Sequence, residues 1–229
     1  MRAMYQECLR LFESSLKFDC GILQKFNNVK LLDSSSIMLP ESMKELYRGH
    51  GSGFKHCSRK VKASIKLQTL YNYSTQTISK IDILEGIRSD QGYRDYLPDI
   101  NSNDLLIADL LGYFVPKSFK NLSDKGDYFI SRYKADTNIY DRAANKLYLL
   151  KLLQKESFWQ DEILLGKETL LPVRIVCHKL TKEQSEGRRR KANSLAKSRG
   201  YKSSQRNQHL LDWSIFILIY LKIKLVSSI

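Results

Sequence analysis

The sequence predicts an α/β fold, a mixed β-sheet with flanking helices, and three observations support this. Short apolar runs of strand length recur between residues 29 and 133, helix-forming or polar segments separate them, and two of the runs end in an aspartate. Apolar runs of about four to eight residues between turn signals are typical of buried strands. With 229 residues, the chain is long enough for one large core or for a core that carries an insertion.

The first elements along the chain are a helix and three strands. Apolar residues at helical spacing predict a leading helix over residues 4–26, and Val29–Asp33 is expected to form a short buried strand. The glycine-rich loop 49–53 separates it from two antiparallel strands, expected at 63–73 and 76–84. The loop matches no nucleotide-binding glycine pattern, so a connector is favoured over a phosphate-binding loop.

The later elements are shorter and less regular. A helix start is expected at 101–104, a buried strand at 105–109, a basic helical turn at 117–125 and a further strand at 128–133. Beyond these, short apolar runs give way to a polar, basic segment at 181–208.

The charge of the chain indicates a polyanionic partner. Lys and Arg number 38 against 24 Asp and Glu, a net charge of +14. Residues 1–140 carry 20 basic and 16 acidic side chains, a net +4, whereas residues 141–229 carry 18 and 8, a net +10. Nucleic acid is the usual partner of such a protein, and a membrane surface is the alternative. The apolar run at 213–221 is too short for a membrane span, which needs about 20 residues, so no membrane partner is expected.

The cysteines favour a reducing, cytoplasmic environment. They are scattered and contain no CxxC pair, and the spacing of His50, His56 and Cys57 matches no common zinc site. We expect isolated reduced thiols, the pattern usual in the cytoplasm, at Cys8, Cys20, Cys57 and Cys177.

Two aspartates could form a metal site. Asp33 and Asp109 each end an apolar strand, 76 residues apart in the chain. If the two strands are neighbours, the carboxylates meet at one edge of the sheet. Carboxylate oxygens suit Mg²⁺ or Mn²⁺, and paired metals promote phosphodiester cleavage. The alternative is that each aspartate is only a helix cap or a turn residue.

Four stretches carry a resemblance to a known family: Leu31–Ser35; Gly49–Gly53 with Lys66–Gln68; Ile107–Phe114 with Gly126–Arg132; and Leu211–Trp213. Together they resemble the insertion-sequence transposases of the DDE type, in the IS-four group. The resemblance implies a ribonuclease-H-like core at 29–134 after a leading helix at 1–28. It also implies a β-rich insertion domain at 135–217, followed by an aberrant tail at 218–229.

The resemblance also implies an activity. Such an enzyme cleaves the ends of a mobile element and joins them to target DNA, and Asp33 and Asp109 correspond to its first two ligands of Mg²⁺ or Mn²⁺. Transposon ends and target DNA are the implied partners, and the intact enzyme is a possible homodimer. The implied location is the bacterial cytoplasm, on the nucleoid when the protein is bound to DNA.

The chain departs from the family at its third acid, a glutamate in a helix where Tyr is followed at the third position by Arg. None of the 13 tyrosines here has that Arg, and Asp212 is the last acidic residue. We therefore expect a copy truncated at both ends, inactive by itself, with a frameshift near residue 217. The alternatives are a catalytically inactive DNA-binding or regulatory fragment, and a degenerate reading frame.

Several side chains are candidates for DNA contact. Trp213 matches a position where related transposases stack an aromatic ring on a flipped base, with a buried core role as the alternative. Arg132 and Lys134 lie at the end of the last core strand and could contact phosphates, with a solvated pair as the alternative. A basic stripe in the later segment could contact the DNA backbone or simply be a solvated helix face; its members are Arg188, Arg189, Arg190 and Lys191.

Overall fold

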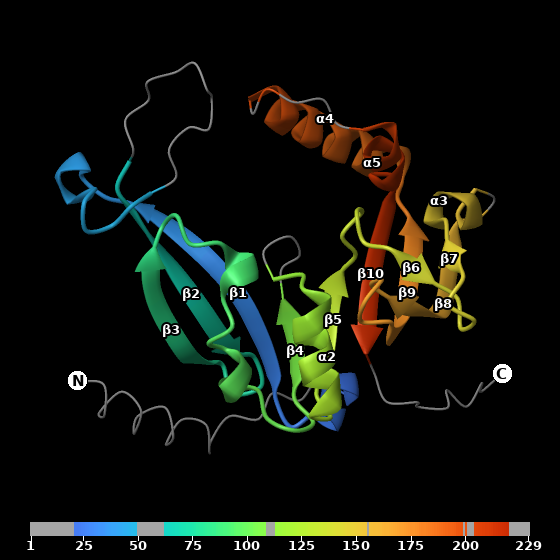
Figure 1. Ribbon diagram of the computed structural model, residues 1–229, viewed down its shortest axis with the longest axis horizontal. Coiled ribbons are helices and arrows are strands. Elements are labelled where there is room, and N and C mark those ends of the chain that lie inside the picture. The colour runs from blue at the N-terminus through green and yellow to red at the C-terminus, as the bar shows by residue number, and fades with distance from the viewer. Residues whose placement is uncertain are drawn as a thin grey trace.

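The computed structural model describes residues 21–49, 62–108, 113–154, 156–198, 200 and 204–219. These residues form a mixed α/β fold around one ten-stranded sheet, in the order β3-β2-β1-β4-β5-β10-β9-β8-β6-β7 (Figure 1). The predicted α/β class with a mixed sheet is confirmed. Most of the leading helix and of the glycine-rich loop fall outside the described residues.

The first half of the sheet contains the strands that the sequence predicted, except that the first one runs five residues past Asp33, its predicted end. β1 (Val29–Met38), β2 (Ser64–Asn72) and β3 (Thr77–Glu85) pair antiparallel. β4 (Leu105–Ala108) lies parallel to β1, and β5 (Tyr128–Arg132) lies parallel to β4.

The second half of the sheet comes from the segment expected to be a separate insertion domain. Its strands are β6 (Ile139–Tyr140), β7 (Lys146–Leu147), β8 (Phe158–Leu165) and β9 (Leu171–Lys179). β10 (Trp213–Ile219) pairs antiparallel with both β5 and β9, and so joins the two halves. β10 runs two residues past the expected boundary at 217; the domain division itself stays a prediction.

Short helices connect the strands. The α-helices are α2 (Pro116–Asp124), α3 (Leu149–Leu152), α4 (Lys182–Ser198) and α5 (Gln205–Leu210). The 3₁₀ helices are η1 (Gly21–Lys25), η2 (Glu41–Met43), η3 (Asp90–Gly92) and η4 (Leu97–Asp99). Within the described ranges, no helix is long and apolar enough to cross a membrane.

One local expectation was too short and one was wrong. The basic helical turn expected at 117–125 is the longer helix α2, because Phe119 and Leu122, one helical turn apart, are both buried against the sheet. The helix start expected at 101–104 is a turn, in which Asn103 has a φ of 66° and the Asp104 carboxylate accepts a hydrogen bond from the Asn101 backbone N–H at 2.9 Å. A side chain that bonds its local backbone in this way competes with helix formation.

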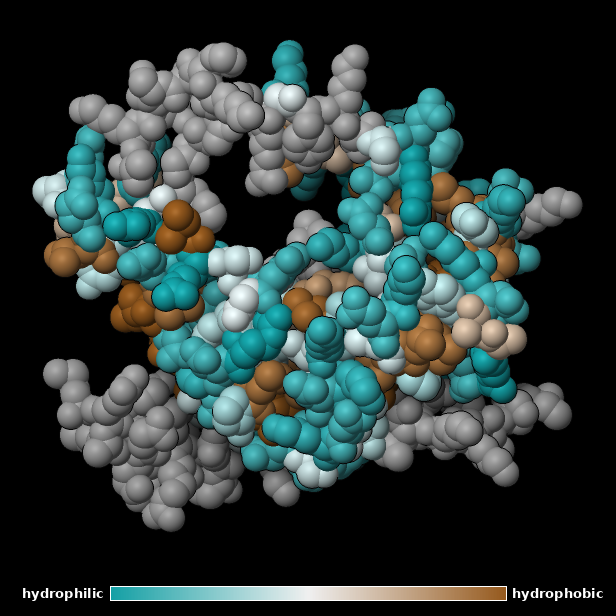
Figure 2. Space-filling model, in the orientation of Figure 1, coloured by the Kyte–Doolittle hydropathy of each residue, from teal (hydrophilic) through white to brown (hydrophobic). Residues whose placement is uncertain are grey.

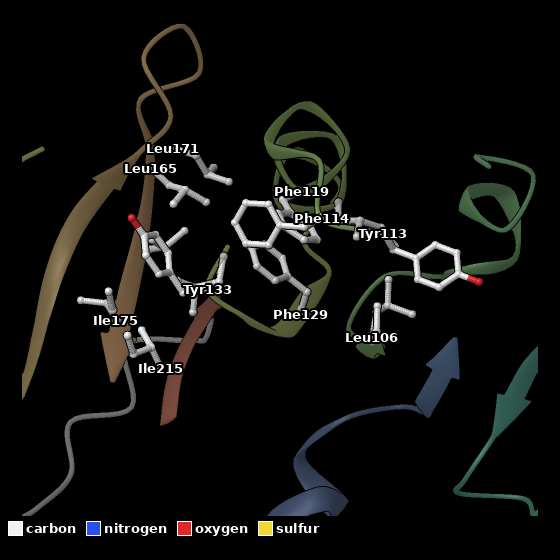
Figure 3. Packing of buried hydrophobic residues seen from close by; sticks show 14 of the residues in the cluster. Leu106, Tyr113, Phe114, Phe119, Phe129, Tyr133, Leu165, Leu171, Ile175 and Ile215 are labelled. Atoms are coloured by element: carbon white, nitrogen blue, oxygen red, sulfur yellow. The ribbon is translucent and has the colours of Figure 1, made fainter. Parts of the chain in front are cut away.

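One face of the sheet is packed by an aromatic core. Phe119 of α2 stacks on Phe129 of β5 with ring centroids 4.1 Å apart, and Phe114 meets Phe119 edge-on. Figure 3 shows the Tyr113 ring directed away from these phenylalanines, on the far side of Leu106. Alternate residues of β2 are buried because this covered face takes every second side chain.

The opposite face, which includes Asp33, is more open in its outer part. Ile37 of β1 is 45% exposed, and Ile81 and Ile83 of β3 are 43% and 62% exposed. Strand pairing places these side chains on the face of Asp33, because Thr69 lies opposite both Asp33 and Ile81. Figure 2 shows hydrophobic surface on the side of the molecule where β3 lies.

Candidate metal and nucleic-acid site

The two aspartates follow residues that the sheet pairs directly. Asp33 lies in the middle of β1, opposite Thr69 of β2, and its side chain is exposed. Leu32, the residue before it, lies opposite Ala108, the last residue of β4, in parallel register. Asp109 lies outside the described residues. The expectation that the two strands are neighbours is confirmed, and the metal-binding roles of the two aspartates stay predictions.

The Asp33 carboxylate has the chemistry that a hard divalent cation requires. It offers two oxygen donors at an exposed strand position. Among the described residues, no three His, Cys, Asp or Glu side chains group closely enough to hold a metal. Asp33 therefore fits as one ligand of a site that needs a further carboxylate from the end of the neighbouring strand.

A buried polar network lies next to Asp33 on the covered face. The Tyr113 hydroxyl donates a hydrogen bond to Gln68 Oε1, and the Ser34 side chain also hydrogen bonds to this hydroxyl. Gln68 Nε2 and Lys66 Nζ both donate to Asp90 Oδ1, at 2.8 and 3.0 Å. Burial, and then the negative charges of Asp90 and Asp33, raise the pKa of Tyr113, while the Ser34 bond lowers it. The phenol is therefore held as a neutral donor.

A second buried polar cluster lies at the N-terminal end of β1. Lys30 Nζ lies 2.8 Å from Asp104 Oδ2 and donates to the Asp99 carbonyl at 2.5 Å; the side chains of the ion pair are 6% and 0% exposed. Asn28 Nδ2 donates to Asp104 Oδ1 at 2.9 Å. Both Asp127 carboxylate oxygens are buried without a hydrogen-bond partner in the described structure. Burial first, and then the Asp104 charge, raise the pKa of Asp127.

Sequence reasoning missed both clusters. The available signal was a charged or amide residue inside an apolar strand pattern, as at Lys30 and Gln68. Such residues are seldom buried unless they are paired, so each one implied a partner elsewhere in the chain.

The structure divides the basic stripe of α4 into two pairs, and the first pair is used internally. Arg188 donates to the Trp213 carbonyl at 3.1 Å and to Ser214 Oγ at 3.0 Å. Arg189 forms an ion pair with Asp212 at 2.5 Å, in which the side chains are 40% and 26% exposed. These bonds fasten α4 to the start of β10. They stabilise the fold. They also occupy guanidinium N–H groups of Arg188 and Arg189 that could otherwise donate to DNA phosphates.

The second pair of the stripe is exposed to solvent. Arg190 and Lys191 are exposed, whereas Arg132 and Lys134 are half-buried near β5. Burial, and then the positive charge of Arg132, lower the pKa of Arg188, so β5 and α4 bring two arginines close together. The DNA-contact roles of these side chains are untested and stay predictions.

Trp213 packs into the core. It is 7% exposed and belongs to the hydrophobic cluster, with Lys179 Nζ lying 6.0 Å from its ring centroid. It also borders a pocket of about 340 Å³, whose other lining residues are Leu150, Leu153, Gln154, Lys179, His209 and Asp212. This burial supports the core role; stacking on a flipped base stays a prediction.

Of the four cysteines, only Cys177 is among the described residues. It is a free thiol, fully buried, and burial raises its pKa to about 12. Cys8, Cys20 and Cys57, together with His50 and His56, lie outside the described ranges.

Comparison with protein families gives one match over most of the chain. The transposase DDE domain family matches residues 24–220. This range includes every described strand and both aspartates of the proposed pair.

Individual relatives are transposases of bacterial insertion sequences. The transposase of IS231F from Bacillus thuringiensis subsp. israelensis is 24% identical over 217 residues, covering 86% of this chain and 44% of its own length. The transposase of IS1151 from Clostridium perfringens is 29% identical over 190 residues, covering 71% of this chain and 37% of its own length. The chain therefore spans less than half the length of these relatives.

Among solved structures, the piggyBac transposase in a synaptic complex with hairpin DNA matches with a TM-score of 0.39 and 10% identity. The match covers 83% of this chain and 32% of that one. A TM-score this low does not establish a common fold.

Proposed function

Because this chain belongs to the transposase DDE domain family, we propose that it forms the part of a transposase that holds a divalent metal between Asp33 and Asp109. The whole enzyme would cut the ends of a mobile element and join them to target DNA. Mg²⁺ or Mn²⁺ is the proposed ion, since carboxylates are its preferred protein ligands.

The observation that carries the proposal is the parallel register of β1 and β4. Leu32 pairs with Ala108, so one further residue of the same pairing would bring Asp33 and Asp109 together. Neighbouring strands lie about 4.8 Å apart, which lets two carboxylates share metals spaced about 3.5–4 Å apart. Paired divalent ions supply stabilisation of the attacking and leaving oxygens in phosphodiester cleavage.

The protein's own residues then have distinct roles. Asp33 would bind the metal from an exposed position, where DNA has access. Asp109, directly after β4, would supply the second carboxylate. The buried Tyr113 network would support β1 on the face of the sheet opposite Asp33. The sheet order β3-β2-β1-β4-β5, with β1, β4 and β5 parallel, supports the ribonuclease-H-like core that we propose for residues 29–134.

Metal-directed cleavage of the polypeptide tests the proposed pair. Fe²⁺ with ascorbate replaces Mg²⁺ and generates radicals that cut nearby backbone. We expect cuts close to residues 33 and 109, competed by excess Mg²⁺ and lost in Asp33→Asn. The control is Asp161→Asn, an exposed aspartate on β8, which should keep the pattern. Cuts that persist in Asp33→Asn would refute the site.

We further propose that the third acid is not supplied by these 229 residues, so that the chain alone does not cut DNA. Incubation with Mg²⁺ or Mn²⁺ and supercoiled DNA carrying element ends should give nicking at background level. Metal-dependent cutting that Asp33→Asn abolishes would contradict this part of the proposal and leave the metal site intact.

A second candidate function is DNA binding without cleavage, as a regulatory fragment. The net +10 of residues 141–229 and the exposed Arg190 and Lys191 favour it. Binding of element ends without nicking, and inhibition of a full-length transposase on co-expression, would identify this role. Homodimerisation of the intact enzyme and a cytoplasmic location on bacterial DNA are parts of the proposal that light scattering and cell fractionation can test.

A further inference from the structure

Tyr113 links three segments that surround the proposed metal site. It lies five residues after the end of β4, its side chain is 2% exposed, and its hydroxyl donates to Gln68 of β2. The Ser34 side chain of β1 bonds the same hydroxyl. One phenol, five residues after β4 in the sequence, therefore connects to both β1 and β2.

The two partners of this hydroxyl are the direct neighbours of the proposed ligand. Ser34 follows Asp33 on β1, and Gln68 lies opposite Ser34 in the register of β2, while Thr69 lies opposite Asp33. Successive residues of a strand point to opposite faces of the sheet. Tyr113 therefore bonds Ser34 and Gln68 on one face, and Asp33 points to the other face. Beyond this position the side chains of β1 are mostly exposed, so besides its backbone pairing with β2 the strand has few buried side-chain contacts here.

We propose that Tyr113 is a positioning residue for the metal site, acting on the Asp33 carboxylate through Ser34 and Gln68. This inference rests on the proposed function. The Tyr113 hydroxyl links to the Ser34–Gln68 pair of β1 and β2, next to Asp33. Outer partners of metal ligands set the orientation of those ligands and so the affinity for the ion.

The hydrogen bonding of the buried Gln68 side chain depends on the phenol. Gln68 is 0% exposed, and its amide nitrogen is already committed to Asp90 at 2.8 Å, so its carbonyl oxygen depends on Tyr113. Tyr113→Phe keeps the ring, which meets Tyr96 edge-on at 6.3 Å, and removes only the hydroxyl. The ring packing remains, and the connection to Ser34 and Gln68 is lost.

The test measures Mn²⁺ binding to the full 229-residue chain, from the free-ion electron paramagnetic resonance signal. We expect Tyr113→Phe to weaken Mn²⁺ binding about tenfold, within the range usual for outer partners of metal ligands. Tyr93→Phe is the matched control: this ring is 5% exposed and packs on Tyr96 at 5.8 Å, and its hydroxyl donates to Asp82 at 2.5 Å, away from Asp33. It should bind Mn²⁺ like the unchanged chain, and thermal melts check that both variants fold.

Asp33→Asn separates failure of the inference from failure of the proposed function. If Asp33→Asn leaves Mn²⁺ binding unchanged, the proposed metal site is wrong. If Asp33→Asn abolishes binding while Tyr113→Phe binds as tightly as Tyr93→Phe, the metal site stands and the positioning role is refuted. A Tyr113→Phe variant that folds but binds about tenfold more weakly than Tyr93→Phe supports the role.

Discussion

Replacing Lys30 by methionine should remove a large part of the stability of the sheet. Lys30 and Asp104 form an ion pair at 2.8 Å with side chains only 6% and 0% exposed, so the substitution leaves a buried carboxylate without its counter-charge. Breaking such a pair costs about 3–5 kcal/mol. Hydrogen bonds to Asp104 from Asn28 and from the Asn101 backbone remain, which places the expected loss near the lower limit, about 3 kcal/mol.

Urea unfolding followed by circular dichroism measures this loss as a fall in the free energy of unfolding. The matched control is Lys120→Met: its partner Asp124 is one helical turn away at 3.2 Å and the side chains are 49% and 60% exposed. Such a surface pair contributes about 0.3–0.5 kcal/mol. The double variant Lys30→Met with Asp104→Leu should recover much of the loss, because it removes the Asp104 carboxylate that the single variant leaves without its counter-charge. A loss for Lys30→Met no larger than that for Lys120→Met would refute the reasoning.

Three further predictions concern single features. Burial raises the pKa of Asp127 above the unfolded value of 3.8, so the folded protein loses stability as pH rises from about 3.8 through the raised pKa. Asp127→Asn should therefore gain in melting temperature over the unchanged chain as pH rises from 4 to 7; a constant difference would contradict this. Replacing both Arg190 and Lys191 by alanine should reduce the slope of log affinity for DNA against log salt by roughly two units, whereas Lys117→Ala at another exposed site should not. Trp213→Ala should cost about 3–5 kcal/mol of unfolding free energy, because the ring is 7% exposed; a loss below about 1 kcal/mol would place the ring outside the core.

The start of β1 and all of β4 could be predicted from sequence because each is a short apolar run followed by an aspartate, and the structure pairs the residues before the two aspartates. The continuation of β1 past Asp33 could not, because Ser34, Ser35 and Ser36 have no apolar pattern and extend the strand by pairing with β2. Helix α2 was expected only as a basic helical turn, because just two apolar positions, Phe119 and Leu122, mark the face that packs on the sheet.

The polar supports of the site could not be predicted, since each depends on a partner far away in the chain. Gln68 and Tyr113 are 45 residues apart, and Arg188 meets Ser214 across 26 residues. For the same reason the apolar run after Asp212 was expected to lead into an aberrant tail. Its first seven residues form β10 inside the sheet, because β5 and β9 each offer a free edge to pair with.

The place of β10 in the sheet also fixes an order of assembly on the ribosome. β5 ends at Arg132 and its outer neighbour begins at Trp213, 81 residues later in the chain. At about 5–20 residues per second, roughly 4–16 s of synthesis separate the two strands. During that interval the edge of β5 has unpaired backbone N–H and C=O groups. Such an edge can pair with a strand of another chain and so promotes aggregation. The nascent chain should therefore depend on chaperone protection until β10 emerges and docks.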